Sequence, residues 1–123
     1  AKVHVPVDLA ERARTIADSH GADVLVALGG GSAIGLAKAI VRLRGDGTPI
    51  VAVPSTYSGS EMTPVWGTTE HGMKRTGTDP AVLPKSVIYD PALFAGLPIA
   101  IAGPSGMNAI AHAVEALWAS NST

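Results

Sequence analysis

The chain has 123 residues and a formal net charge of −1 at pH 7, with 46% hydrophobic and only 15% charged residues. This composition excludes a disordered tail, because disorder goes with low hydrophobicity and high net charge. It also argues against nucleic acid as a partner, since polyanion binders concentrate Lys and Arg on one face and no basic cluster here is larger than Lys74-Arg75. The absence of cysteine excludes disulfides, thiolate catalysis and Cys-based zinc sites together.

The most apolar stretch of the chain, residues 93–107, is interrupted by three glycines and two prolines. A membrane-spanning helix needs roughly 20 mostly apolar residues, so we expect no membrane partner. The N-terminal residues do not combine a basic region with an apolar run, as a signal peptide would. We therefore expect a cytoplasmic protein.

The first predicted helix covers Asp8 to His20. Asp8 and Glu11 have the spacing of a capping box, in which each side chain satisfies a free backbone N–H of the first turn. Apolar residues then recur at helical spacing as far as Gly21, a residue suited to a left-handed C-cap. The uninterrupted apolar run from Val24 to Leu28 predicts a strand that is buried on both faces of a parallel sheet.

A second helix is predicted from Ser32, which we expect to be its N-cap, to the residues just before Gly45. The short apolar run from Ile50 to Val53 predicts a second strand, which stops at Pro54. Strand, glycine turn, helix and strand make one βαβ unit with parallel strands. An open parallel sheet usually has more strands than two, so we expect the chain to be part of a longer polypeptide.

Smaller elements follow the second strand. Residues 65–69 and 73–76 predict a β-hairpin around His71-Gly72, and Ser86 to Tyr89 predicts a further short strand. A segment with two prolines, residues 97–104, leads into a final helix predicted to begin at Ser105. The apolar stripe of this helix predicts a buried face.

The strongest candidate site is the run Gly29-Gly30-Gly31-Ser32, which lies between a predicted buried strand and a helix N-terminus. Glycines let the backbone approach an anion closely, and the first-turn N–H groups with the helix dipole favour negative charge there. The spacing is neither the dinucleotide fingerprint G-x-G-x-x-G nor a complete Walker loop. The run therefore indicates a phosphate-binding turn, with a tight turn that binds no ligand as the alternative.

A second candidate is the hydroxyl-rich segment Ser55 to Glu61, which follows the next predicted strand. Because the carboxyl ends of parallel strands meet at one edge of a sheet, both loops should face one crevice. Ser and Thr hydroxyls suit phosphate, ribose and amide groups, although such loops are also ordinary surface turns.

A third candidate is the pair Asn108 and His112, which are neighbours on one helix face because they are four residues apart. Such a pair can share a ligand. The alternative is that both are structural residues of an apolar helix.

Four motifs stand in a recognisable order along the chain: Gly29-Gly30-Gly31-Ser32 followed by Lys38, Pro54-Ser55-Thr56 with Gly59-Ser60-Glu61, Asp90-Pro91, and Ser105 to Glu115. Their order and spacing resemble the iron-containing alcohol dehydrogenase superfamily along nearly the whole chain. Within that superfamily, the chain most resembles the maleylacetate reductase branch. The residues that carry this likeness are Gly35 to Lys38, Thr56 to Thr63, Val65-Trp66-Gly67 and Ser105 to Asn108.

The resemblance implies a two-domain enzyme with a Rossmann-like, nicotinamide-nucleotide-binding α/β domain, an all-helical C-terminal domain and an active site between them. Residues 1–91 would belong to the first domain and residues 92–123 would begin the second. The complete enzyme would be a homodimer. By position, the coenzyme-binding residues would be Gly30, Gly31 and Ser32 at the pyrophosphate of NADH or NADPH, Ser55, Thr56 and Ser58 at the nicotinamide and its ribose, and Lys74 near the coenzyme.

Departures from the superfamily pattern favour the reductase branch. Metal-dependent members carry Asp where this chain has Asn108, and a neutral amide oxygen attracts a divalent cation less than a carboxylate does. The resemblance therefore implies an enzyme that needs no metal. Gly35 stands where the wider superfamily has Asp, and the hydroxyl-rich loop is one residue shorter than its commoner form.

The reductase branch implies NAD(P)H-dependent reduction of the C=C bond of maleylacetate, a small dicarboxylate, to 3-oxoadipate in aromatic and chloroaromatic breakdown. Asn108 would donate a hydrogen bond to the negative charge that develops on the ketone oxygen. His112 would give a proton or anchor a substrate carboxylate. The alternatives are a metal-dependent alcohol dehydrogenase of the same superfamily that acts on a carbonyl, and an inactive fragment with residual nucleotide binding.

Overall fold

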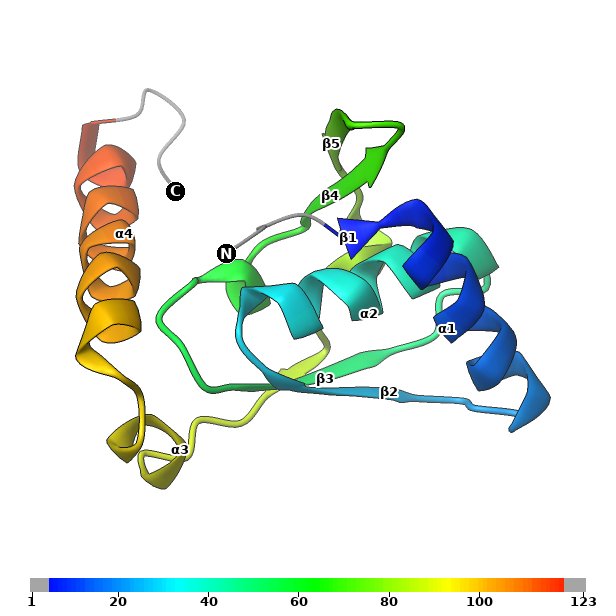
Figure 1. The fold of residues 1–123 in the computed structure, drawn as a ribbon, viewed down its shortest axis with the longest axis horizontal. Helices are drawn as coiled ribbons and strands as arrows, with labels where there is room; N and C mark the ends of the chain where they lie inside the picture. Colours follow the sequence, from blue (N-terminus) through cyan, green and yellow to red (C-terminus); the bar gives the residue numbers. More distant parts are fainter. Residues whose placement is uncertain (1–4, 119–123) are drawn as a thin grey trace.

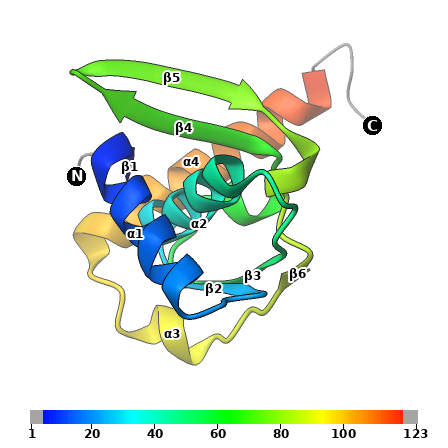
Figure 2. The same ribbon diagram turned by 90° about the vertical axis from the view of Figure 1, so that its right-hand side faces the viewer.

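The structure is a computed structural model that describes residues 5–118. Apart from the C-terminal segment, these residues form three layers (Figure 2). A parallel sheet makes one outer layer, two helices make the middle layer, and a β-hairpin makes the other outer layer.

The parallel sheet contains β2 (Leu25–Gly29), β3 (Ile50–Pro54) and β6 (Ser86–Val87), in the order β2-β3-β6. Leu25 pairs with Ile50 and Gly29 with Pro54, so β2 and β3 end at the same edge. The predicted strands and their parallel arrangement are confirmed.

The crossover between β2 and β3 is helix α2 (Gly31–Arg44), which packs on one face of this sheet. Small residues of both strands, Ala27 and Ala52, let the helix approach closely, and Ile34 fills the space between with no exposed surface. Val82, from the short 3₁₀ helix η2 (Pro80–Val82), completes this core. The predicted βαβ unit, and with it the α/β fold class, is confirmed.

The second outer layer is a sheet of β1 (Val5–Pro6), β4 (Val65–Glu70) and β5 (Met73–Thr78), in the order β1-β4-β5. The predicted hairpin is confirmed, and both residues of its two-residue loop, His71 and Gly72, have positive φ as a type I′ turn requires. Helix α1 (Val7–Ser19) lies beside α2 in the middle layer.

Both predicted helix caps are wrong. Asp8 is the second residue of α1, and the N-cap is Pro6, because β1 runs directly into the helix. The N-cap of α2 is Gly30, and Ser32 lies in the first turn as an exposed residue. Gly30 has no side chain that could accept a hydrogen bond from the first-turn N–H groups, and its backbone carbonyl accepts from the N–H groups of Ala33 and Ile34.

The prediction that β2 is buried on both faces is also wrong for the described residues. The side chains of Val26 and Leu28 are 65% and 62% exposed. The reason is that α2 covers one face of the sheet, and no described element covers the other (Figure 1).

The C-terminal segment contains α3 (Ala92–Ala95) and α4 (Ile99–Trp118). The predicted start of the final helix at Ser105 is wrong: the Pro98 carbonyl already accepts hydrogen bonds from the N–H groups of Ile101 and Ala102. Pro98 precedes the first turn, where proline is tolerated, and Pro104 within the helix removes one backbone hydrogen bond without ending it.

Helix α4 stands apart from the layered part (Figure 1), and none of its described residues is buried. Its apolar stripe therefore has no covering surface within residues 5–118. Over the same residues, no helix combines the length and apolarity needed to cross a membrane.

Candidate functional site

The glycine turn (residues 29–31) and the hydroxyl loop (residues 55–60) meet at the carboxyl edge of the parallel sheet. The register of β2 and β3 brings their ends together, and the Ser55 N–H donates to the Gly29 carbonyl over 2.9 Å. The two loops thus form one edge, as expected from parallel strands.

The two loops pack so closely that side chains on the glycine turn would collide with the hydroxyl loop. A Cβ on Gly30 would lie 3.0 Å from Thr56 Cγ2, and a Cβ on Gly31 would lie 3.1 Å from Ser58 Cβ. A larger residue at either position would require Thr56 or Ser58 to move, so glycine gives the closest packing of the two loops. The contact leaves the backbone at the start of α2 beside two hydroxyl groups.

The N-terminus of α2 gives this edge a positive electrostatic character. The helix has 14 residues, and no acidic side chain lies in its first turn. The partial positive charge of the helix dipole is therefore uncompensated within the turn, and an anion beside it is stabilised. Ser32, which is exposed in this first turn, adds a hydroxyl group.

Sequence reasoning missed a buried cation behind the hydroxyl loop. Lys38 of α2 is only 1% exposed, and its Nζ donates to the carbonyl oxygens of Ser60, Thr63 and Val65 at 2.7, 2.7 and 2.8 Å. Burial lowers the pKa of Lys38 to about 8, and the nearby Glu61 carboxylate opposes this shift. The spacing of Lys38 from the glycine turn was visible in the sequence, but the contacts were not.

Glu61, in the 3₁₀ helix η1 (Ser60–Met62), is a buried carboxylate beside this lysine. The Tyr89 hydroxyl donates to Glu61 Oε1 over 3.0 Å, while Glu61 Oε2 is buried with no hydrogen-bond partner among the described residues. Burial, the hydrogen bond to Glu61 and the charge of Glu61 all raise the pKa of Tyr89.

A cavity of about 530 Å³ adjoins the hydroxyl loop. One wall is aromatic, because the rings of Tyr57 and Phe94 stack with centroids 5.1 Å apart. Glu61 and Thr56 supply polar groups, so the cavity suits a flat group that carries hydrogen-bond donors. The lining residues are Thr56, Tyr57, Glu61, Tyr89, Pro91, Phe94 and Ala95.

The structure places one of the two α4 candidates at the hydroxyl loop. Asn108 Nδ2 donates to the Ser58 carbonyl over 3.4 Å. His112 lies one turn further along, with a 66% exposed side chain and its Nδ1 3.8 Å from Glu115 Oε2. Within residues 5–118, no three His, Cys, Asp or Glu side chains come close enough to bind one metal ion.

Lys74 does not join this group of residues. It lies exposed on β5, opposite Thr69, in the hairpin layer. Figure 2 shows the middle helices between this hairpin and the parallel sheet. Its assignment to the coenzyme stays a prediction.

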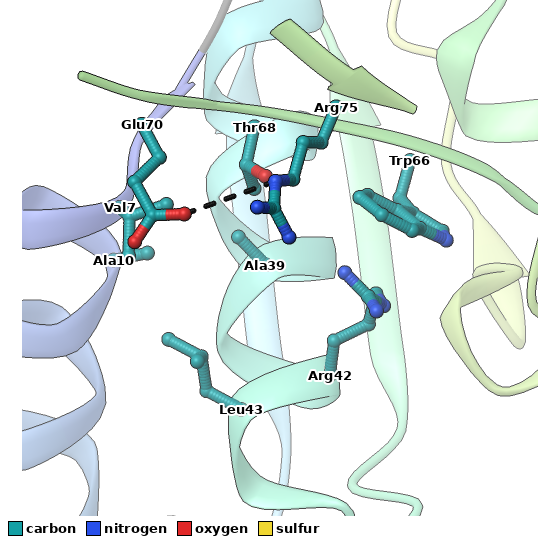
Figure 3. A pocket seen from close by; sticks show the side chains of 9 residues that line it. All are labelled: Val7, Ala10, Ala39, Arg42, Leu43, Trp66, Thr68, Glu70 and Arg75. Atoms are coloured by element: carbon teal, nitrogen blue, oxygen red, sulfur yellow. Dashed lines mark ion pairs between the residues drawn. The ribbon is translucent and has the colours of Figure 1, made fainter. Parts of the chain in front are cut away.

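A second cavity, of about 210 Å³, lies between the helices and the hairpin (Figure 3). Its two guanidinium groups already have partners inside the chain: Arg42 lies 3.4 Å from the Trp66 ring centroid, and Arg75 Nε lies 3.8 Å from Glu70 Oε2. We therefore place the candidate site at the glycine turn and not in this cavity.

An α/β fold with a glycine turn at a helix N-terminus, and hydroxyl groups on the neighbouring loop, is typical of nucleotide-binding domains. Comparison with known proteins narrows the class. The sequence profile described as iron-containing alcohol dehydrogenase matches residues 1–91. The chain belongs to this family.

The similar proteins include several maleylacetate reductases. The chain is 56% identical over 119 residues to the maleylacetate reductase of Burkholderia cepacia, covering 97% of this chain and 33% of that protein. The crystal structure of maleylacetate reductase from Agrobacterium tumefaciens matches with a TM-score of 0.92 and 49% identity, over 98% of this chain and 34% of the other.

A more distant structure contains a bound coenzyme. The sulfoacetaldehyde reductase of Bifidobacterium kashiwanohense, in complex with NAD⁺, matches with a TM-score of 0.82 and 29% identity, over 92% of this chain and 35% of the other. The chain thus spans about a third of the length of the proteins it matches.

Proposed function

We propose that the chain supplies the coenzyme-binding part of an NAD(P)H-dependent maleylacetate reductase, which reduces the C=C bond of maleylacetate to 3-oxoadipate. Similarity to maleylacetate reductases at 49% to 56% identity supports this reaction over others of the family. The NAD⁺ complex of the sulfoacetaldehyde reductase supports a nicotinamide coenzyme.

The observation that carries the proposal is the glycine turn packed against the hydroxyl loop. Because Gly30 and Gly31 have no Cβ atoms, the Thr56 and Ser58 side chains pack directly beside the backbone at the N-terminus of α2. Bare N–H groups at a positive helix end fit a pyrophosphate, and the adjoining hydroxyls fit a ribose or an amide. The residues present therefore fit a dinucleotide coenzyme.

When bound, the nicotinamide coenzyme supplies the hydride. The chain's own residues then have two tasks, to hold the coenzyme and to stabilise the charge that develops on the substrate oxygen. The coenzyme would be held by Gly30, Gly31, Ser32, Ser55, Thr56 and Ser58.

Asn108, which already reaches the hydroxyl loop, would donate an amide N–H to the developing oxyanion, as preorganised donors do. His112, on the same face of α4, would provide a proton or bind a substrate carboxylate. This arrangement needs no metal ion as Lewis acid.

The complete enzyme is further proposed to be a cytoplasmic homodimer. These two properties rest on the resemblance to the family and on no contact within residues 5–118.

The proposal is tested with NADH, NADPH and maleylacetate on the full-length protein. We expect saturable binding of at least one reduced coenzyme and turnover of maleylacetate, with no comparable turnover of simple aldehydes. Turnover of aldehydes that depends on Fe²⁺ or Zn²⁺ would instead identify a metal-dependent alcohol dehydrogenase. If the full-length protein neither binds NADH or NADPH nor turns over maleylacetate, the proposal is refuted.

The variant His112→Ala tests the catalytic assignment. If His112 acts on the substrate, kcat/KM for maleylacetate falls about 100-fold, as for loss of a general acid, and the Kd for NADH changes less than about twofold. An equal loss of NADH binding would identify a structural residue instead. Glu115→Gln is the matched control, because it removes the carboxylate that lies 3.8 Å from His112 Nδ1 and leaves the imidazole in place.

A further inference from the structure

We propose that Lys38 is a positioning residue for the coenzyme site: its ammonium group holds residues 60–65 against α2 and thereby fixes the hydroxyl loop beside the glycine turn. This inference rests on the proposed coenzyme binding. It adds a residue that has no contact with the bare turn itself.

The segment from the hydroxyl loop to the start of β4, residues 55–65, is attached to α2 at two places. At its start, Thr56 and Ser58 pack against Gly30 and Gly31, at the first turn of the helix. At its end, the carbonyl oxygens of residues 60, 63 and 65 converge on the Lys38 ammonium group, two turns further along the same helix. One rigid helix therefore sets the position of the whole segment between β3 and β4.

The three N–H donors of Lys38 match three close carbonyl acceptors, and Thr63 Oγ1 is a fourth, longer contact at 3.4 Å. A lysine ammonium group has three N–H donors and no acceptor, and three backbone carbonyls lie within 2.8 Å of Nζ. Residues 60–65 contain one turn of 3₁₀ helix and the first residue of β4, Val65, which pairs with Thr78. The Ser60 carbonyl accepts a further, longer hydrogen bond of 3.4 Å from the Thr63 N–H. The ammonium group thus supplies the shortest hydrogen bonds of this segment to α2 and joins its three carbonyls at one point.

Burial of the Lys38 ammonium group costs free energy, and filling the space in the core does not require a charge. A methionine side chain would fill the same volume without the cost of removing an ammonium group from water. What the charge adds is a single geometry for three carbonyl groups, because charge-assisted hydrogen bonds are short and directional. A buried lysine at position 38 is therefore better explained by the need to fix the hydroxyl loop in one position than by a gain in stability.

Loss of the proton from Lys38 should loosen the hydroxyl loop, whereas its effect on the free energy of unfolding has the opposite sign. The groups that face its ammonium are the Glu61 carboxylate from η1 and, behind it, the Tyr89 hydroxyl. Arg42 is the next cation on α2 and lies over Trp66. Above its pKa of about 8, neutral Lys38 has two donors for three carbonyls, so the loop loosens.

The sign for stability is opposite. The folded-state pKa of Lys38, about 8, lies below its ordinary value of 10.5. The unfolded chain therefore binds more protons between these pH values, and the contribution of Lys38 to the free energy of unfolding rises with pH. The pKa of Tyr89 is shifted upward by burial and by Glu61, in the direction opposite to the shift of Lys38.

The first experiment measures the Kd for NADH and the urea midpoint of the unmodified full-length protein from pH 7 to pH 9.5. We expect the Kd to rise by about tenfold over this pH range, as for loss of a charged hydrogen bond. The same measurements on the variant Lys38→Met serve as reference for stability. Relative to this variant, the urea midpoint of the unmodified protein should rise with pH. A Kd that stays constant between pH 7 and pH 9.5 while the midpoint moves would identify a purely structural lysine and would overturn the proposal.

The second experiment uses variants at pH 7. Lys38→Met should raise the Kd for NADH and the amide exchange rate of residues 59–66 by about tenfold each, without faster exchange in residues 73–78. Lys38→Arg, whose charge persists at all these pH values, should restore binding and remove its pH dependence. Lys85→Met, at an exposed lysine outside the site, is the control and should change neither quantity.

The two proposals fail in different ways. Unchanged exchange of residues 59–66 in a folded Lys38→Met protein overturns the role of Lys38, whether or not NADH binds. Absence of NADH binding by the unmodified protein refutes the proposed function, and the exchange measurement then decides alone whether Lys38 holds the loop. If Lys38→Met does not fold, the pH dependence of the Kd for NADH still decides, because the Kd of the unmodified protein should rise with pH and that of Lys38→Arg should not.

Discussion

Helices α2 and α4 are both long and apolar, but they have opposite surroundings. Six of the 14 residues of α2 are buried, between the parallel sheet on one side and the hairpin layer on the other. None of the 20 residues of α4 is buried, although α4 is the more apolar of the two. A hydrogen bond from Asn108 to the Ser58 carbonyl joins α4 to the layered part.

The difference shows that an apolar stripe predicts a contact surface and not its partner. The sheet that covers α2 is formed by the two strands that flank it in the sequence, so its burial follows from local connectivity. Exposed apolar surface on the scale of α4 indicates an interaction surface. Within residues 5–118, the elements that would cover it are not present.

The largest expected effect is that of a truncation in the buried helix. Ile34→Ala removes a side chain with no exposed surface, and we expect the free energy of unfolding of the 123-residue chain to fall by about 2–5 kcal/mol. Urea denaturation followed by circular dichroism measures it.

Ile110→Ala is the matched substitution on α4, where the side chain is 57% exposed. We expect a change within about 0.5 kcal/mol. A loss above about 1 kcal/mol would show that α4 is packed against another surface in solution, which would remove the contrast between the two helices.

An intermediate effect is expected where α2 meets the hydroxyl loop. Gly31→Ala places a methyl group 3.1 Å from Ser58 Cβ, so Ser58 must move. We expect the Kd for NADH to rise about tenfold, the equivalent of one lost charged hydrogen bond, with a stability change within about 1 kcal/mol because alanine favours the helix. Fluorescence titration of the full-length protein measures the affinity.

Gly67→Ala is the control for this substitution. Its Cβ would make an ordinary contact of 3.6 Å with Thr76 Cγ2 in the hairpin layer. The Kd for NADH should stay within about twofold of the unmodified value. If Gly31→Ala behaves in the same way, the glycine turn has no role in coenzyme binding.

The smallest effect is expected from metal removal, which probes α4. Because Asn108 offers a neutral amide in place of a carboxylate, dialysis against a chelator should leave the maleylacetate reductase activity of the full-length protein unchanged. Activity that is lost on dialysis and restored only by Fe²⁺ or Zn²⁺ would contradict this prediction.

Local patterns determined the elements of this protein and most of their order. The apolar runs at residues 24–28 and 50–53 were sufficient for two parallel strands, and the turn at His71-Gly72 for the hairpin, because these signals act over a few residues. The same patterns brought the glycine turn and the hydroxyl loop to one edge, since parallel strands end together.

The boundaries and the burial depended on tertiary structure. Asp8 and Ser32 have cap-forming side chains, but the preceding strands run into the helices and shift both caps to Pro6 and Gly30. The exposed outer face of β2 could not be predicted, because burial depends on which elements cover a strand.

Lys38 shows both what the local sequence determined and what only the tertiary structure decided. The sequence determined that a lysine lies two helical turns beyond the glycine turn, on a helix next to a hydroxyl-rich loop. Only the folded chain brings three carbonyl oxygens from residues 60 to 65 onto its ammonium group, 22 to 27 residues away along the chain. Such a contact is decided by the path of an irregular loop through space, which has no periodicity that a sequence pattern could reveal.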